Sequence, residues 1–370
     1  MKLNTKINFN IEKLLKELNI NPTQLYKTLT VTLCVSVFLL CALIVLSVPL
    51  PLGSDPYFHL NISKFYFEGN FQDAFNYITS VNMMPFYPPL YHTVMLAPVV
   101  LSGAYYDGLR ILEMFTMPLT FTFTLYLLYK YASPKAALIT GLTLLGSWSF
   151  IDGALQARPQ ALSMMLYPLT IIALYACQKK RFILYSALSI YNHGVYAVSI
   201  LLGPTLYRLK QKSWRKTVLA ALIVSSPILA LTGYYFGNGL EMWATLQPVE
   251  NPQETLFWTN PAWIPFYSGL TLIGVMFLFA KSKSELETIF KYGFVANLIM
   301  LPIWADRWLQ YSAIPLACLV GLNISRWHGK KLYVALSVIA LGAWIYISFF
   351  LLNSVTANWW QPGRSMLPGS

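Results

Sequence analysis

The residues best suited to acid–base chemistry stand just after the first long apolar run. This stretch opens with Asp55-Pro56 and carries His59. Asp followed by Pro is typical of a helix start, because Asp caps free backbone N–H groups and Pro tolerates the first helical position. Asp55 and His59 would then lie four residues apart on one helix face. A carboxylate there could serve as a general base for an acceptor hydroxyl; the alternative is a simple helix cap beside a packed histidine.

Three later stretches also place polar groups at the ends of apolar runs. They are 151–159, with Asp152 and Arg158; 192–193, with His193; and 304–308, with Asp306 and Arg307. Arginine is costly to bury without an anion, and its planar donors suit phosphate oxygens. Arg158 and Arg307 are therefore candidate phosphate ligands. Pairing with neighbouring aspartates or contact with lipid headgroups is the alternative for both.

The composition is that of a polytopic membrane protein. The 370-residue chain is 56% hydrophobic and only 11% charged, and its mean hydropathy is +0.52. A soluble globule of this size carries far more polar surface. Apolar runs of roughly 17–25 residues recur along the chain, and such a run can cross a bilayer as a helix. The runs are continuous rather than alternating, which favours helices over a membrane barrel.

These runs predict an all-α fold of about eleven transmembrane helices with a long first external loop. The loop, residues 51–108, is rich in aromatic residues and proline, and we expect its apolar stretch 89–101 to form an interfacial helix. The predicted spans are 28–50, 109–129, 136–150, 161–177, 182–191, 195–207, 218–236, 263–280, 289–303, 309–324 and 332–352.

Basic residues sort to one side of these spans. With the N-terminus inside, about 21 of the 26 Lys and Arg residues fall on the cytoplasmic side, as the positive-inside rule requires. We therefore expect a multi-pass protein of the plasma membrane or endoplasmic reticulum, surrounded by membrane lipids. The net charge of +12 does not indicate nucleic-acid binding, because the charge is dispersed over short loops rather than gathered on one folded face.

Most acidic residues sort to the opposite, external side, where the polar stretches also lie. Titratable groups concentrated at one membrane face among aromatic residues are what an external active site requires. The candidate substrate-binding residues of this face are Tyr57, Tyr87, His92 and His193.

The order of these features resembles the GT-C superfamily of integral-membrane glycosyltransferases. A cytoplasmic N-terminus and one span precede a long external loop that opens with Asp-Pro-Tyr-Phe-His from residue 55 and later carries Tyr-Pro-Pro-Leu-Tyr from residue 87. The first motif is similar to the first-loop motif of oligosaccharyltransferase catalytic subunits. The second resembles the Pro-Pro-Leu element of protein O-mannosyltransferases and lipid A aminoarabinose transferases. The resemblance is best over residues 28–178.

The resemblance implies transfer of a sugar from a polyprenyl-phosphate or polyprenyl-diphosphate donor to a lipid, glycan or protein acceptor on the outer side, with inversion at the anomeric carbon. Asp55 matches the first-loop carboxylate that orients or deprotonates the acceptor; His59 is a second catalytic candidate from its place beside Asp55 alone. Asp152 falls where oligosaccharyltransferases carry a second acidic motif, so Asp55 and Asp152 are candidate ligands of Mg²⁺ or Mn²⁺. Arg307 corresponds to the membrane-embedded arginine that would bind the donor phosphate. Arg158 lies in an Ala-Arg-Pro element that resembles the one before the fourth span in several GT-C groups, and it is the second candidate for the donor phosphate.

The sequence also departs from oligosaccharyltransferases. Asp152 stands alone where those enzymes carry paired acids, Trp359-Trp360 is followed by Gln361 rather than Asp, and no large C-terminal domain precedes Ser370. We therefore expect a monosaccharide transferase that uses a polyprenyl-phosphate sugar.

Two other classes of function stay open. A transporter or lipid flippase would place ionisable groups near the bilayer midplane and contain repeated broken helices, whereas the acids here stand at outer span ends. A non-catalytic accessory subunit would not need one cavity joining Asp55 to Arg307.

The expected organisation has four parts. Residues 1–27 form a cytoplasmic amphipathic lead, and 28–236 form the GT-C-like membrane module with the external loop 51–108. Further membrane helices with an external loop at 237–261 occupy 237–355, and 356–370 form a short external tail.

Overall fold

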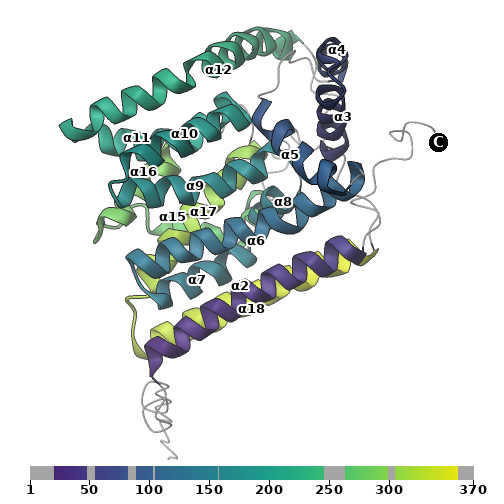
Figure 1. Cartoon of the computed structure of the whole chain (residues 1–370). Helices are drawn as coiled ribbons and strands as arrows, with labels where there is room; N and C mark the ends of the chain where they lie inside the picture. The colour runs from purple at the N-terminus through teal and green to yellow at the C-terminus, as the bar shows by residue number, and fades with distance from the viewer. Residues whose placement is uncertain are drawn as a thin grey trace, which may run out of the picture.

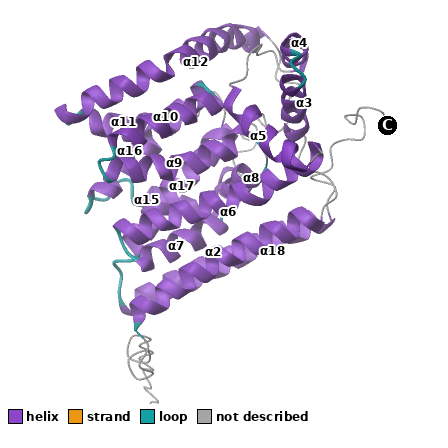
Figure 2. Cartoon of the chain, viewed as in Figure 1, coloured by secondary structure: helices purple, strands orange, loops and turns teal. Residues whose placement is uncertain are grey.

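Every regular element of the described chain is a helix (Figure 2). The computed structural model describes residues 21–47, 55–81, 89–102, 105–156, 158–245, 263–298 and 305–356. The elements are α2 (Pro22–Ser47), α3 (Asp55–Phe67), α4 (Phe71–Val81), α5 (Pro89–Ser102), α6 (Tyr105–Tyr131), α7 (Pro134–Leu145), α8 (Trp148–Leu155), α9 (Pro159–Tyr175), α10 (Lys179–His193), α11 (Val195–Leu209), α12 (Lys212–Thr245), α14 (Trp263–Ser268), the 3-10 helix η1 (Gly269–Leu272), α15 (Ile273–Met276), α16 (Glu285–Asn297), α17 (Ala305–Ile324) and α18 (Gly329–Thr356).

The long helices form a bundle whose helix ends collect on two opposite sides (Figure 1). Within it, α9 packs against α10, α11 against α16, and α17 against α7. Helices α3 and α4 stand across one end, at the right of Figure 1, with α5 and α8 beside them. The polar stretches singled out in the sequence belong to the helix ends on this side.

The basic loops meet at the other end of the bundle. Lys135 Nζ donates to the Trp327 carbonyl at 3.0 Å, which joins the start of α7 to the α17–α18 loop. The buried Arg208 at the end of α11 forms an ion pair of 2.9 Å with Glu285 at the start of α16. The loops predicted to be cytoplasmic therefore gather on one side, away from α3 and α4.

Among the described residues, four helices are long and apolar enough to cross a membrane, and the number rises to five if the bent pair α7–α8 is one span. The four are Pro22–Ser47, Gly108–Tyr131, Lys212–Tyr234 and Gly329–Phe349, and two shorter apolar helices are Pro159–Tyr175 and Leu309–Ile324. These long apolar helices indicate a multi-pass integral membrane protein. The count of eleven spans stays a prediction.

Two predicted spans are not single continuous helices, because each contains a break. The predicted span 136–150 ends as a helix at Leu145, and α8 departs at 84°. The predicted span 263–280 changes direction at Gly269, whose φ of +55° is the left-handed conformation that glycine adopts readily. The two breaks are in contact, because the Leu270 N–H donates a hydrogen bond to the Gly146 carbonyl at 2.8 Å. This contact, between residues distant in sequence, fixes the directions of α8 and α14.

Two predicted boundaries also shift, and one predicted helix is confirmed. Helix α2 begins at Pro22 rather than near residue 28, because the Asn21 side chain accepts the Thr23 N–H at 2.9 Å and caps it. Helix α12 runs to Thr245, into the loop predicted at 237–261. The helix expected over 89–101 is confirmed as α5. Residues 1–20 of the lead and 357–370 of the tail lie outside the described residues.

Candidate active site

Helix α3 begins at Asp55, as the Asp-Pro pair predicted. Helical register then places His59 one turn along the same face. The side chains of Asp55 and Tyr57 lie outside the described part of the structure, as does all of Tyr87.

His59 contacts a second predicted site residue, His92 of α5. His59 Nδ1 lies 3.1 Å from His92 Nε2, and both rings are buried. One nitrogen of this pair must donate and the other accept, so the contact requires at least one neutral ring. Ser63 Oγ donates to the His59 carbonyl at 2.9 Å. The sequence predicted each histidine separately; the structure brings them together.

Aromatic rings enclose the histidine pair. Tyr91 packs edge-on to His59 with ring centroids 5.3 Å apart, and Tyr66 packs edge-on to His92 at 5.7 Å. Burial raises the pKa of Tyr66, which keeps its phenol protonated. The imidazoles therefore stand among neutral rings.

An apolar cluster attaches α3 and α5 to the bundle. Leu60, Tyr91 and Met95 pack together with Leu162 and Leu166 of α9. Since α9 begins directly after Arg158, the histidine pair is fastened to the helix that carries a predicted phosphate ligand.

Asp152 of α8 is the centre of a hydrogen-bond network. Its Oδ1 accepts from Gln156 Nε2 at 2.6 Å, and its Oδ2 accepts from Tyr267 OH at 2.7 Å and Gln310 Nε2 at 2.9 Å. Gln310 Nε2 also lies 2.9 Å from Tyr267 OH. The network ties α8, α14 and α17 together.

Sequence reasoning missed Tyr267 and Gln310. A signal existed for Gln310, because a glutamine near the start of an otherwise apolar helix is costly unless it is paired. No such signal marks Tyr267, since tyrosines are frequent throughout this chain. Its position depends on the turn at Gly269.

Arg158 and His193 stand at the adjoining ends of α9 and α10. Arg158 is half-buried and is the N-cap residue of α9, with extended backbone (φ −132°, ψ 159°). The neighbouring Asn192 fastens the two helices: its Nδ2 donates to the Pro159 carbonyl at 2.6 Å and to Ser163 Oγ at 2.8 Å. Asn192 therefore holds His193 close to the start of α9.

His193 contacts α17 through Tyr311. His193 Nδ1 hydrogen-bonds Tyr311 OH, and both side chains are buried. Gln310 and Tyr311, consecutive on α17, thus reach Asp152 and His193 respectively. Arg307 stands on α17 one turn before Tyr311, and its backbone position lies beside both contacts. The Arg307 side chain lies outside the described residues.

Four helix ends consequently meet, from α8, α9, α10 and α17. They bring together three predicted residues, Asp152, Arg158 and His193, and the helix turn that carries Arg307. The histidine pair joins this group through the apolar packing of α3 and α5 on α9. Transfer of a phosphate-linked group needs a base for the acceptor and positive charge for the departing phosphate. The start of α3 carries a carboxylate, and the starts of α9 and α17 carry arginines.

The predicted Mg²⁺ or Mn²⁺ site stays a prediction, because the side chain of Asp55, one of its two predicted ligands, lies outside the described residues. Among the described residues, no three His, Cys, Asp or Glu side chains are grouped so as to hold one. Both oxygens of Asp152, a predicted ligand, accept hydrogen bonds from neutral donors. This arrangement suits a structural carboxylate.

No protein-family model and no curated protein matches the sequence. Solved structures do match the fold. ArnT from Cupriavidus metallidurans bound to undecaprenyl phosphate superposes with a TM-score of 0.53 at 16% sequence identity, covering 92% of this chain. ArnT from the same organism in the apo state gives 0.56 at 15% identity, covering 89%. The chain spans 66% of the length of each ArnT chain.

At this identity the likeness concerns the fold. It extends over almost the whole chain, beyond residues 28–178, where the sequence resemblance was best. The fold of the chain is therefore similar to that of ArnT.

Proposed function

We propose that the protein is a membrane glycosyltransferase that moves a sugar from a polyprenyl-phosphate donor to an acceptor on the extracytoplasmic side. The observation that carries this proposal is the ArnT-like fold, found in a structure bound to undecaprenyl phosphate. The meeting of four helix ends around Asp152 and Arg158 supports it, because the site lies opposite the basic loops.

In the proposed reaction the acceptor hydroxyl attacks the anomeric carbon from the face opposite the phosphate. The bond between that carbon and the phosphate oxygen breaks, and its electron pair leaves with the phosphate. Attack from that face inverts the configuration, and Asp55 takes the hydroxyl proton, so charge balances. Asp55 is our proposed catalytic residue, because it matches the first-loop carboxylate of GT-C enzymes and stands at the start of α3.

The departing phosphate gains negative charge, which Arg158 and Arg307 neutralise. Arginine suits this role because its planar donors match phosphate oxygens. A low-dielectric surrounding at the membrane edge strengthens the attraction. Asp152 acts as a positioning residue in this proposal: through Gln310 it holds the α17 turn that carries Arg307.

His59 also acts by positioning, since its ring is buried against His92 and fixes the face of α3 that Asp55 shares. Tyr57, Tyr87, His92 and His193 stay proposed substrate contacts. The sugar-transfer assay with different acceptors decides whether the acceptor is a lipid, a glycan or a protein.

The test uses the purified full chain in lipid nanodiscs with a panel of radiolabelled polyprenyl-phosphate monosaccharides. We expect loss of sugar from at least one donor, with formation of free polyprenyl phosphate, only when the protein and an acceptor extract are present. Movement of intact donor between leaflets of proteoliposomes, with no sugar released from any donor, would instead identify a flippase.

A further inference from the structure

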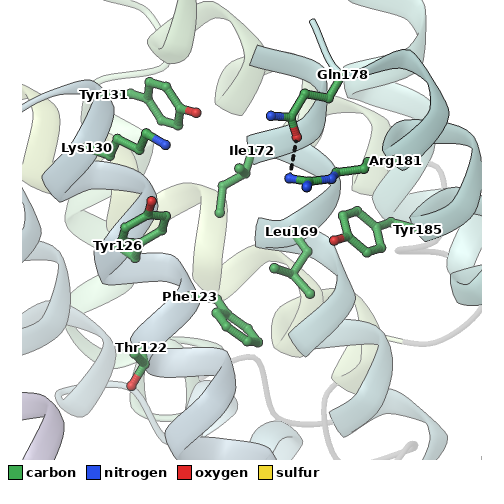
Figure 3. Close-up of a pocket in the computed structure, with 10 residues that line it drawn as sticks. All are labelled: Thr122, Phe123, Tyr126, Lys130, Tyr131, Leu169, Ile172, Gln178, Arg181 and Tyr185. Carbon is green, nitrogen blue, oxygen red and sulfur yellow. Dashed lines mark hydrogen bonds between the residues drawn. The ribbon is translucent and has the colours of Figure 1, made fainter. Parts of the chain in front are cut away.

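A cavity lies at the end of the bundle away from the candidate active site. It encloses about 410 Å³ between α6, α9 and α10 (Figure 3). This volume falls within the roughly 300–1,000 Å³ typical of small-molecule sites. The lining residues that matter below are Phe123, Lys130, Leu169, Ile172 and Arg181.

One end of this cavity is cationic. Lys130 and Arg181 approach from opposite walls and point toward its middle (Figure 3). Lys130 Nζ lies 5.5 Å from the centre of the Tyr126 ring and 5.4 Å from that of Tyr131. Arg181 Nη1 donates to Gln178 Oε1 at 3.0 Å.

Neither cation forms an ion pair with a carboxylate among the residues that the structure describes. Each is held instead by neutral groups, which orient the charge without cancelling it. An anion entering this end would therefore meet two uncompensated positive charges.

The other end is apolar. Phe123 and Leu169 line it, about two turns inside α6 and α9, and Ile172 lies between them and the cationic end (Figure 3). From Phe123 to Lys130 the helix rises about 10 Å, at about 1.5 Å per residue. The cavity thus runs from charged helix ends toward the apolar middle of the bundle.

We propose that this cavity binds an anionic glycerophospholipid from the leaflet on the basic side. The phosphate lies between Lys130 and Arg181, and the first carbons of an acyl chain lie along Phe123, Leu169 and Ile172. A free phosphate would use the cationic end and leave the apolar end unfilled. A zwitterionic lipid would bring a positive headgroup to a site that already holds two cations.

The test measures lipid retention by native mass spectrometry on the purified, detergent-solubilised full chain. Phosphatidylglycerol, phosphatidylcholine with the same acyl chains, and inorganic phosphate are the three probes. The K130Q/R181Q variant removes both cations, and K180Q/K212Q is the matched control, because these two exposed lysines stand at the same end outside the cavity.

We expect wild type and control to retain phosphatidylglycerol over phosphatidylcholine. K130Q/R181Q should weaken retention of phosphatidylglycerol about 10- to 30-fold, the scale of losing two cations beside a lipid phosphate. Filling the apolar end with I172W should weaken it as well, while both cations stay.

Equal retention by K130Q/R181Q and the control would overturn the proposal. So would inorganic phosphate binding as tightly as phosphatidylglycerol, because the acyl chain would then contribute nothing. The readout does not involve sugar transfer, so its outcome is independent of the proposed activity.

Discussion

Asp152 illustrates how the surroundings of one residue decide its role. In the sequence it was a candidate metal ligand through the resemblance alone, since it falls where oligosaccharyltransferases carry a second acidic motif. In the structure its two oxygens accept three hydrogen bonds from Gln156, Tyr267 and Gln310. Carboxylates with this many donors are strongly held, and a lost partner leaves a buried polar group unpaired.

Replacing Asp152 with Asn should destabilise the protein. The amide presents an N–H₂ group where an oxygen now accepts hydrogen bonds, and we expect a loss of about 1–3 kcal/mol in the free energy of unfolding. Tyr267→Phe removes one donor and should cost less, about 0.5–1.5 kcal/mol. Thermal unfolding in detergent, with the exposed Asp73→Asn as control, measures both. An unchanged midpoint for Asp152→Asn would show that the network contributes nothing to stability.

Arg158 offers a separate test of the donor site. Arg158→Gln should weaken binding of undecaprenyl phosphate about 10- to 100-fold, the range expected for losing a charge-assisted hydrogen bond. The affinity of Arg158→Lys should lie between those of wild type and Arg158→Gln, because the charge remains but the planar guanidinium group is lost. Titration of the lipid into purified protein measures the affinity. The exposed Arg215→Gln at the opposite end should bind as wild type does, and equal affinity of Arg158→Gln and this control would exclude Arg158 from the site.

The ends of a helix could be predicted where the residues that determine them are close in sequence. The start of α3 follows from Asp55-Pro56, and most apolar runs became helices near their predicted places. The breaks at Gly146 and Gly269 were not predictable, because they depend on a hydrogen bond between Leu270 and Gly146, far apart in sequence. These breaks set the directions of α8 and α14. The hydrogen-bond partners of Asp152 depend on those directions, so they could not be predicted from the sequence either.

The close packing of α11 on α16 predicts that a larger residue at Gly203 destabilises the protein. A Cβ added at Gly203 would collide with the backbone of Tyr292 and Gly293, whereas one added at Gly233 of α12 meets nothing within 4 Å. Gly203→Ala should therefore cost at least about 1–3 kcal/mol of stability. Gly233→Ala, the matched control, should be neutral or slightly stabilising. Thermal unfolding decides between them, and equal midpoints would contradict the observed helix contact.

The whole molecule has two chemically different ends. Basic loops and their ion pairs occupy one, and α3, α5 and the Asp152 network occupy the other. Charge distribution along the sequence predicted this separation, because the positive-inside rule acts on individual loops. Which outer residues meet could not be predicted, since that depends on helix packing between distant segments.

The orientation of these ends can be measured by cysteine labelling in intact cells. Native Cys177 is exposed between α9 and α10 at the basic end. We expect it to react with a membrane-impermeant maleimide only after permeabilisation. Asn70→Cys, between α3 and α4 in a Cys177→Ser background, should react without it. Labelling of both sites from the same side would contradict the predicted topology.

The most direct test of the proposed function is sugar transfer by Asp55→Asn. Once a donor and acceptor are identified, this variant should lose at least about 100-fold in kcat, because a general base contributes roughly 10²–10⁴-fold. Glu68→Gln, an equal change of charge just after the same helix, should transfer sugar as wild type does. Both variants should still bind undecaprenyl phosphate, which would show that the site is intact. Transfer by Asp55→Asn at the wild-type rate would contradict the assignment of the catalytic carboxylate.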